Sequence, residues 1–158
     1  MTNDSKKRFV AERAPVLATI ILTRHGDLTI VDTKRNTELD LHVFIDRKDK
    51  PMRLMFGVLL RGVLSAATPK QANRILRISM AQFQGMRKFT YPVCLFFFSM
   101  RDEQAFFSWL AEPVLAGGAL ELVHHEKANC VELTDEKLDQ VVEQIVAWYD
   151  AVESVLIA

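Results

Sequence analysis

One acidic and one basic residue stand at the ends of two apolar runs that are neighbours in the sequence. Asp40 enters the alternating run from Leu39 to Asp46, and Arg61 leaves the long apolar run of residues 52–64. A charged connection joins the two runs, so they are predicted to form paired strands. A carboxylate beside a cation on neighbouring strands can form part of a site for a hard divalent metal such as Mg²⁺. Asp40 and Arg61 are therefore the first candidate site residues, with Asp40 as the candidate metal ligand.

A histidine stands close to this acid. His42 lies two residues after Asp40, so both side chains point to the same face of the predicted strand. It could form an acid–base pair with Asp40. The alternative is an ordinary surface histidine.

A helix is predicted before these strands. Apolar residues recur at helical spacing over residues 8–23, while residues 1–7 are polar and expected to be frayed. Pro15 would either lie in the first turn of a shorter helix or kink a longer one. An alternative makes Val16–Thr23 a strand, because Thr19, Ile20 and Ile21 are β-branched.

Three further elements are expected, one before the two paired strands and two after them. Residues 28–32 form a short β-rich run, and a helix is expected from Thr68 and Pro69 to near residues 87–88. Tyr91–Ser99 is an unbroken apolar run, which is typical of a strand buried on both faces.

The last third of the chain is predicted to hold two helices and two short strands. Gln104–Leu110 is interpreted as a short aromatic helix. After a turn at Gly117-Gly118, residues 119–124 and 130–133 are interpreted as a pair of short strands. Thr134 then caps a final amphipathic helix.

Together these elements predict one α/β (α+β) domain over residues 1–158, with a mixed central sheet flanked by helices. The sequence contains no apolar run long enough for a membrane span and no apolar segment of a secretory signal near its start. Cys94 and Cys130 lie in apolar segments and are expected to be buried, reduced thiols. The expected location is the cytoplasm, with no membrane partner.

The net charge of zero conceals a strong asymmetry. Residues 1–101 hold 18 Lys and Arg against 8 Asp and Glu, whereas residues 102–158 hold 2 against 12. A basic part of this kind can bind a polyanion. The favoured interpretation is that the acidic final helix packs against the basic part of its own fold.

The middle of the chain resembles a bacterial family of unknown function related to the PD-(D/E)xK restriction-endonuclease-like fold. The matching segments are LDLHVFI with Asp40, the strand FGVLLRG, and the later block PVCLFFFS…FFSWL. The resemblance implies an α-β-β-β-α-β core, followed here by a hairpin and a helix. It also implies that an acid at the Asp40 position and a Gln or Glu at the Leu59 position hold Mg²⁺ in an active member. A lysine at the Arg61 position would orient or deprotonate the attacking water, and Glu12 would match an acid beside the metal.

This chain departs from that pattern at two positions. Leu59 cannot ligate a metal, and the guanidinium of Arg61 is a poor proton acceptor. We therefore expect a catalytically inactive nuclease-fold domain, without a cofactor, that binds nucleic acid or a protein partner. One alternative is a non-enzymatic interaction module that forms a homodimer. The other is an active Mg²⁺-dependent nuclease, which would need Asp46 or Asp49 to replace Leu59 in a different strand register.

Overall fold

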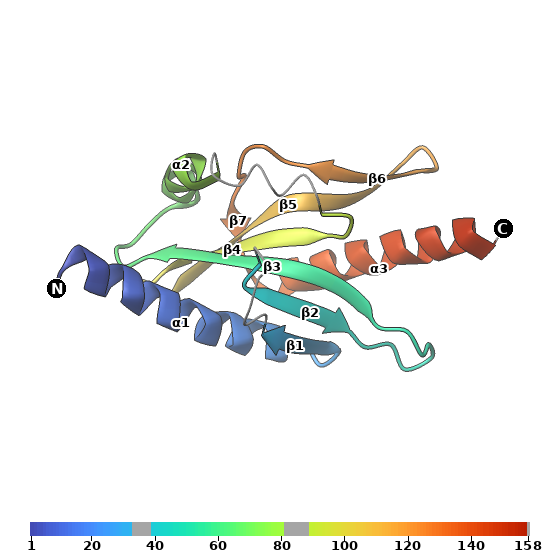
Figure 1. Cartoon of the computed structure of the whole chain (residues 1–158), viewed down its shortest axis with the longest axis horizontal. Helices are drawn as coiled ribbons and strands as arrows, with labels where there is room; N and C mark the ends of the chain where they lie inside the picture. The colour runs from blue at the N-terminus through green and yellow to red at the C-terminus, as the bar shows by residue number, and fades with distance from the viewer. Residues whose placement is uncertain (33–38, 81–88, 158) are drawn as a thin grey trace.

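The computed structural model describes residues 1–32, 39–80 and 89–157 (Figure 1). These residues form three helices: α1 (Asn3–Thr23), α2 (Pro69–Met80) and α3 (Asp135–Ile157). Their strands are β1 (Leu28–Asp32), β2 (Leu41–Ile45), β3 (Leu54–Val63), β4 (Val93–Ser99), β5 (Gln104–Ala116), β6 (Ala119–His124) and β7 (Val131–Glu132). The predicted mixed α/β class is confirmed, as is the order of helix, three strands, helix and strand.

All seven strands belong to one mixed sheet. Its order is β1-β2-β3-β4-β5-β6, and β7 also pairs with β5. The pair β3–β4 is parallel, while the other neighbours are antiparallel. A parallel pair needs a crossover connection, and α2 lies in the segment that joins β3 to β4.

Helices cover both faces of the sheet. Apolar residues of α1 and α3 pack on one face, where Leu22 and Ile145 share a buried cluster with Phe56 and Phe96. On the other face, Leu76 of α2 packs in a second cluster. Figure 1 shows α2 apart from the layer of α1 and α3. None of the helices in the described part of the chain has the length and hydrophobicity of a membrane span.

The expected aromatic helix over Gln104–Leu110 is wrong, because these residues belong to strand β5. Side chains alternate along a strand, so Phe106 joins the α2 face and Phe107 joins the α1–α3 face. Each packs on a phenylalanine of β4: the ring centroids of Phe97 and Phe106 are 6.4 Å apart, and those of Phe96 and Phe107 are 6.2 Å apart. Residues 104–110 are extended because they pair with β4, which is fully buried. The sequence predicted β4 as a buried strand.

The two short strands near the C-terminus exist but do not pair with each other. Both β6 and β7 are antiparallel neighbours of β5. The hairpin is instead β5–β6, which turns at Gly117 and Gly118 with φ angles of 57° and 83°. These positive φ angles favour glycine.

Helix α1 is longer than the sequence pattern indicates. The expectation of a frayed start is wrong, because Thr2 caps the helix by accepting a hydrogen bond from the Ser5 amide at 3.1 Å. The strand alternative for residues 16–23 is also wrong, since the helix runs through Pro15. For α2, the expected end near residues 87–88 lies outside the described residues.

Ion pairs join the acidic α3 to the basic first part of the chain. Arg47 lies 2.6 Å from Asp150, and Arg24 lies 3.2 Å from Asp135. The hydrogen bond from Arg47 is the main cause that lowers the pKa of Asp150 below its usual value. The interpretation that the acidic helix packs against the basic part of its own fold is thus confirmed.

The two cysteines of the chain are free thiols, as predicted. Both Cys94 and Cys130 are buried. Burial raises the pKa of the Cys130 thiol to about 11 and that of Cys94 still further. Because a thiolate is the reactive form, neither cysteine is a suitable nucleophile at neutral pH.

Gly62 lies where β3 passes very close to β4. A Cβ atom at this position would be 2.7 Å from the carbonyl oxygen of Phe98 and 3.2 Å from the Val10 side chain. We expect Gly62→Ala to lower the free energy of unfolding by about 2 kcal/mol, because backbone must shift to remove the overlap. Urea denaturation measures this loss. Gly26→Ala is the control, since a Cβ there meets nothing within 4 Å; equal losses for both variants would contradict the close approach.

Candidate functional site

The edge of β3 that pairs with β2 has no strand partner among the described residues beyond Val58, because β2 begins at Leu41. The last pair of the β2–β3 register is Leu41 with Val58, and the Asp40 amide still donates to the Val58 carbonyl at 3.1 Å. Beyond Val58 the Asp40 side chain replaces a strand partner: its Oδ2 accepts a hydrogen bond from the Leu60 amide at 2.7 Å. A carboxylate thereby satisfies a backbone donor that β2 does not reach.

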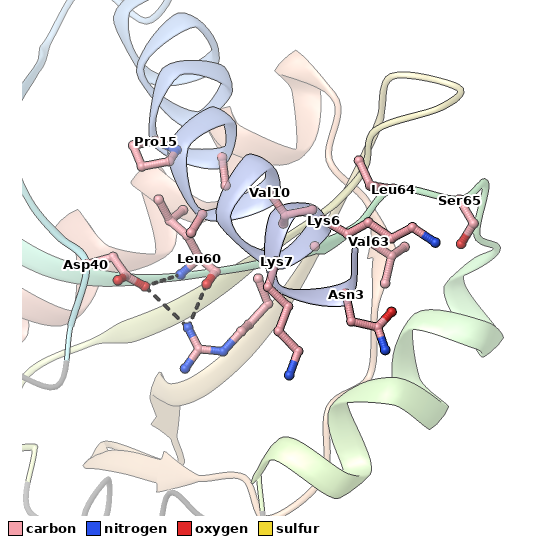
Figure 2. A pocket seen from close by; sticks show the side chains of 14 residues that line it. Asn3, Lys6, Lys7, Val10, Pro15, Asp40, Leu60, Val63, Leu64 and Ser65 are labelled. Atoms are coloured by element: carbon pink, nitrogen blue, oxygen red, sulfur yellow. Dashed lines mark hydrogen bonds and ion pairs between the residues drawn. The ribbon is translucent and has the colours of Figure 1, made fainter. Parts of the chain in front are cut away.

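Arg61 completes the same arrangement. Its Nη1 donates to the Leu60 carbonyl at 2.7 Å and lies 3.5 Å from the Asp40 carboxylate (Figure 2). The structure therefore brings together the acid and the cation that the sequence singled out. Both side chains are only partly buried, so the pair is also accessible from solvent.

The hydrogen bond from Leu60 makes Asp40 a contributor to stability. We expect Asp40→Ala to lower the free energy of unfolding by about 1–2 kcal/mol, because the Leu60 amide loses its acceptor. Asp40→Asn should cost less, since an amide oxygen can still accept this bond. Chemical denaturation of both variants tests the role, and an Asn variant as unstable as the Ala variant would argue against it.

The Asp40–Arg61 pair lies in a groove of about 660 Å³ between the first half of α1 and the end of β3. Figure 2 shows Lys6 and Lys7 on α1 near the residues of β3. The floor is apolar, with Val10 of α1 and Leu60 of β3 among its residues. The groove is thus a hollow with an apolar floor and a charged rim.

Positive charge dominates this groove. Its lining contains Lys6, Lys7 and Arg61 against the single carboxylate of Asp40. No acidic side chain among the described residues forms an ion pair with Lys6 or Lys7. Further exposed cations lie on α2, at the same end of the long axis as the start of α1 (Figure 1): Lys70, Arg74 and Arg77. The local potential therefore favours an anionic ligand.

Two residues of the expected metal site lie elsewhere. Glu12 is 68% exposed and forms an ion pair with Arg8 at 3.0 Å, and it does not line the groove. Leu59 is only 1% exposed and packs in the apolar cluster on the α2 face. Across the described ranges, no group of three His, Cys, Asp or Glu residues is placed to hold a metal ion. The described residues thus give Asp40 no second carboxylate in the groove.

His42 has a different neighbour from the one considered in the sequence. Its Nε2 lies 3.4 Å from the hydroxyl of Tyr91, and the two rings meet edge to face at 6.1 Å. Partial burial lowers the pKa of His42. The nearest described partner of this histidine is therefore a phenol.

The strand register excludes the alternative second ligand. In the observed pairing, Ile45 lies opposite Leu54, so Asp46 is at the far end of the β2–β3 hairpin. The five residues of β2 separate it from Asp40, and these six residue steps span about 20 Å. Asp46 accepts a hydrogen bond from Thr29 at 2.6 Å and pairs with Arg53 at 2.8 Å. The different register that would bring Asp46 or Asp49 to the site is thus wrong.

Sequence reasoning missed Lys6 and Lys7, because residues 1–7 were expected to be frayed. The spacing held a usable signal: Asn3, Lys6, Lys7, Val10 and Ala14 recur three or four residues apart and lie on one side of a helix. Thr2 also has the side chain of a helix N-cap.

Comparison with protein-family models, with curated proteins and with solved structures finds no match to this chain. The class of protein is therefore defined by its own fold and groove: a mixed α/β domain with a basic groove at the end of β3. The resemblance to restriction-endonuclease-like proteins stays a prediction.

Proposed function

We propose that this protein is a non-catalytic nuclease-fold domain that binds nucleic acid through phosphate contacts in the groove between α1 and β3. The observation that carries the proposal is the surplus of cations there. Lys6 and Lys7 line the groove without an acidic partner among the described residues, while Arg24, Arg47 and Lys50 are neutralised by α3.

The chemistry of the ligand follows from this charge. Phosphates are the regularly spaced anions of a nucleic acid, and neutralising them releases condensed counterions. Lysine is a compact charge on a flexible stem and can follow a phosphate backbone without a fixed geometry. Contacts to phosphates carry no base information, so binding is expected to be largely independent of sequence.

The same groove argues against cleavage. The Asp40 carboxylate already accepts the Leu60 amide and faces Arg61. Metal-dependent phosphoryl chemistry needs further oxygen ligands, and the Leu59 side chain is buried in the apolar cluster on the α2 face. Arg61 can stabilise a phosphate but does not accept a proton.

Binding and cleavage can be measured on the same oligonucleotide. A fluorescently labelled DNA strand is titrated with the protein at low salt, once with EDTA and once with Mg²⁺ or Mn²⁺. We expect binding in the presence of EDTA, because no metal is required for it, and no shortened product with either metal. Absence of binding at low salt would refute the nucleic-acid proposal. Metal-dependent cleavage that disappears in Asp40→Asn would refute the non-catalytic part.

A further inference from the structure

One oxygen of the Asp40 carboxylate is left over for a ligand of the basic groove. The hydrogen bond from the Leu60 amide and the ion pair with Arg61 both involve Oδ2, at 2.7 Å and 3.5 Å (Figure 2). No donor among the residues that the structure describes forms a hydrogen bond with Oδ1. The side chain is 42% exposed and lines the groove, so Oδ1 is an acceptor that a bound ligand can reach.

Arg61 makes this carboxylate compatible with an anionic ligand. The guanidinium lies 3.5 Å from Asp40, and opposite charges at this distance largely cancel for a more distant phosphate. The attraction for phosphates then comes from Lys6 and Lys7, which line the same groove. Asp40 therefore acts on a ligand mainly through the hydrogen bond that Oδ1 can accept, and the ligand must supply the donor.

The donor follows from the part of a nucleic acid that this groove contacts. Phosphate oxygens only accept hydrogen bonds, whereas the ribose 2′-hydroxyl of RNA lies on the same backbone and both donates and accepts. Bases also carry donors, but no aromatic side chain among the described residues lines the groove to stack a base beside Asp40. The backbone hydroxyl is therefore the donor that best fits a groove with lysines and one available carboxylate oxygen.

We propose that the groove between α1 and β3 prefers RNA to DNA, because Asp40 Oδ1 accepts a hydrogen bond from a ribose 2′-hydroxyl. Lys6 and Lys7 neutralise the neighbouring phosphates in both kinds of strand. The inference rests on the proposed function and names the class of nucleic acid that the groove takes. It also gives Asp40 a role in recognition that needs no metal ion, and the preference is independent of base sequence.

Three labelled single strands of one base sequence test the preference: RNA, RNA with 2′-O-methyl groups, and DNA in which uracil replaces thymine. The Kd of each is measured by fluorescence anisotropy with the full chain at the same low salt concentration. We expect RNA to bind about 10-fold more tightly than DNA, because a hydrogen bond to a charged acceptor is among the stronger kinds. The 2′-O-methyl strand should bind like DNA, since methylation removes the donor but keeps the ribose.

Substitution of Asp40 shows whether this carboxylate causes the preference. Asp40→Ala should weaken RNA binding to about the level of DNA and leave DNA binding no weaker, whereas a purely structural loss would weaken both alike. Asp40→Asn keeps an acceptor for the Leu60 amide and should therefore stay folded. Its neutral hydrogen bond to the hydroxyl should leave a preference of about 3-fold.

Asp46→Ala is the matched control. Asp46 is also 42% exposed and paired with an arginine, but it lies outside the groove, so this variant should prefer RNA as the wild type does. Equal binding of RNA and DNA by the wild type would overturn the inference and leave the nucleic-acid proposal standing. So would a preference that survives 2′-O-methylation, or one that is unchanged in Asp40→Asn. If no strand binds at low salt, the proposed function fails and this inference fails with it.

Discussion

Glutamate in place of Leu59 is expected to lower the free energy of unfolding by about 4 kcal/mol or more. Leu59 is 1% exposed and packs among apolar residues of β4 and α2, such as Leu95 and Leu76. A carboxylate there would lose its hydration among apolar side chains. Urea or thermal denaturation at neutral pH measures the loss.

This substitution also tests how the domain relates to metal-dependent nucleases. If position 59 had merely lost a metal ligand, Leu59→Glu would be tolerated, and Mg²⁺ would stabilise the variant by binding to the native state. We expect a large destabilisation that Mg²⁺ does not reverse. Leu59→Met is the control for shape, because it conserves volume and should cost less than about 1.5 kcal/mol. A stable Glu variant with a Mg²⁺-dependent melting temperature would contradict the account.

Reversing the charge of Lys6 and Lys7 together is expected to weaken nucleic-acid binding about 100-fold at low salt. Two attractive phosphate contacts are replaced by two repulsive ones, and the counterions that they released stay on the nucleic acid. Both side chains are exposed on α1, so the fold should persist. Fluorescence anisotropy with a labelled oligonucleotide measures the affinity.

A second double variant separates this groove from overall charge. Lys48→Glu combined with Lys127→Glu changes the formal charge by the same amount, and both residues are exposed and lie outside the groove. Its affinity should stay within about three-fold of the wild type, because charges beyond a Debye length of about 10 Å are screened. Similar losses in the two double variants would mean that binding has no defined site on the protein.

The central part of the fold could be predicted because its local patterns agree with its pairing. The alternation from Leu41 to Ile45 and the unbroken apolar run of β4 correspond to observed strands. The run from Gln104 to Leu110 was mistaken for a helix because aromatic residues fit either conformation in isolation. The stacking of Phe106 on Phe97 depends on a neighbouring strand, and such contacts are not visible in the periodicity of one segment.

The candidate site was predicted in part for similar reasons. Asp40 and Arg61 meet because the hairpin register brings the start of β2 to the end of β3, and the sequence indicated both strands. Glu12 was assigned by resemblance, but its position on α1 turns it toward Arg8. Lys6 and Lys7 enter the groove only because α1 extends to Asn3. The helix begins there because Thr2 caps it, and residues 3–9 are all exposed, so no pattern of buried residues marks this first part of the helix.

The salt dependence of nucleic-acid binding by the wild type tests the central claim most directly. The logarithm of the binding constant is plotted against the logarithm of the salt concentration. The slope of this plot reports the number of neutralised phosphates. Lys6 and Lys7 are the net surplus of cations in the groove, because Arg61 is paired with Asp40. We therefore predict a slope of about −2, whose magnitude falls by about 1–2 units in the Lys6→Glu/Lys7→Glu variant. An affinity that does not fall as the salt concentration rises would contradict a phosphate-binding groove between α1 and β3. So would the absence of binding at the lowest salt concentration.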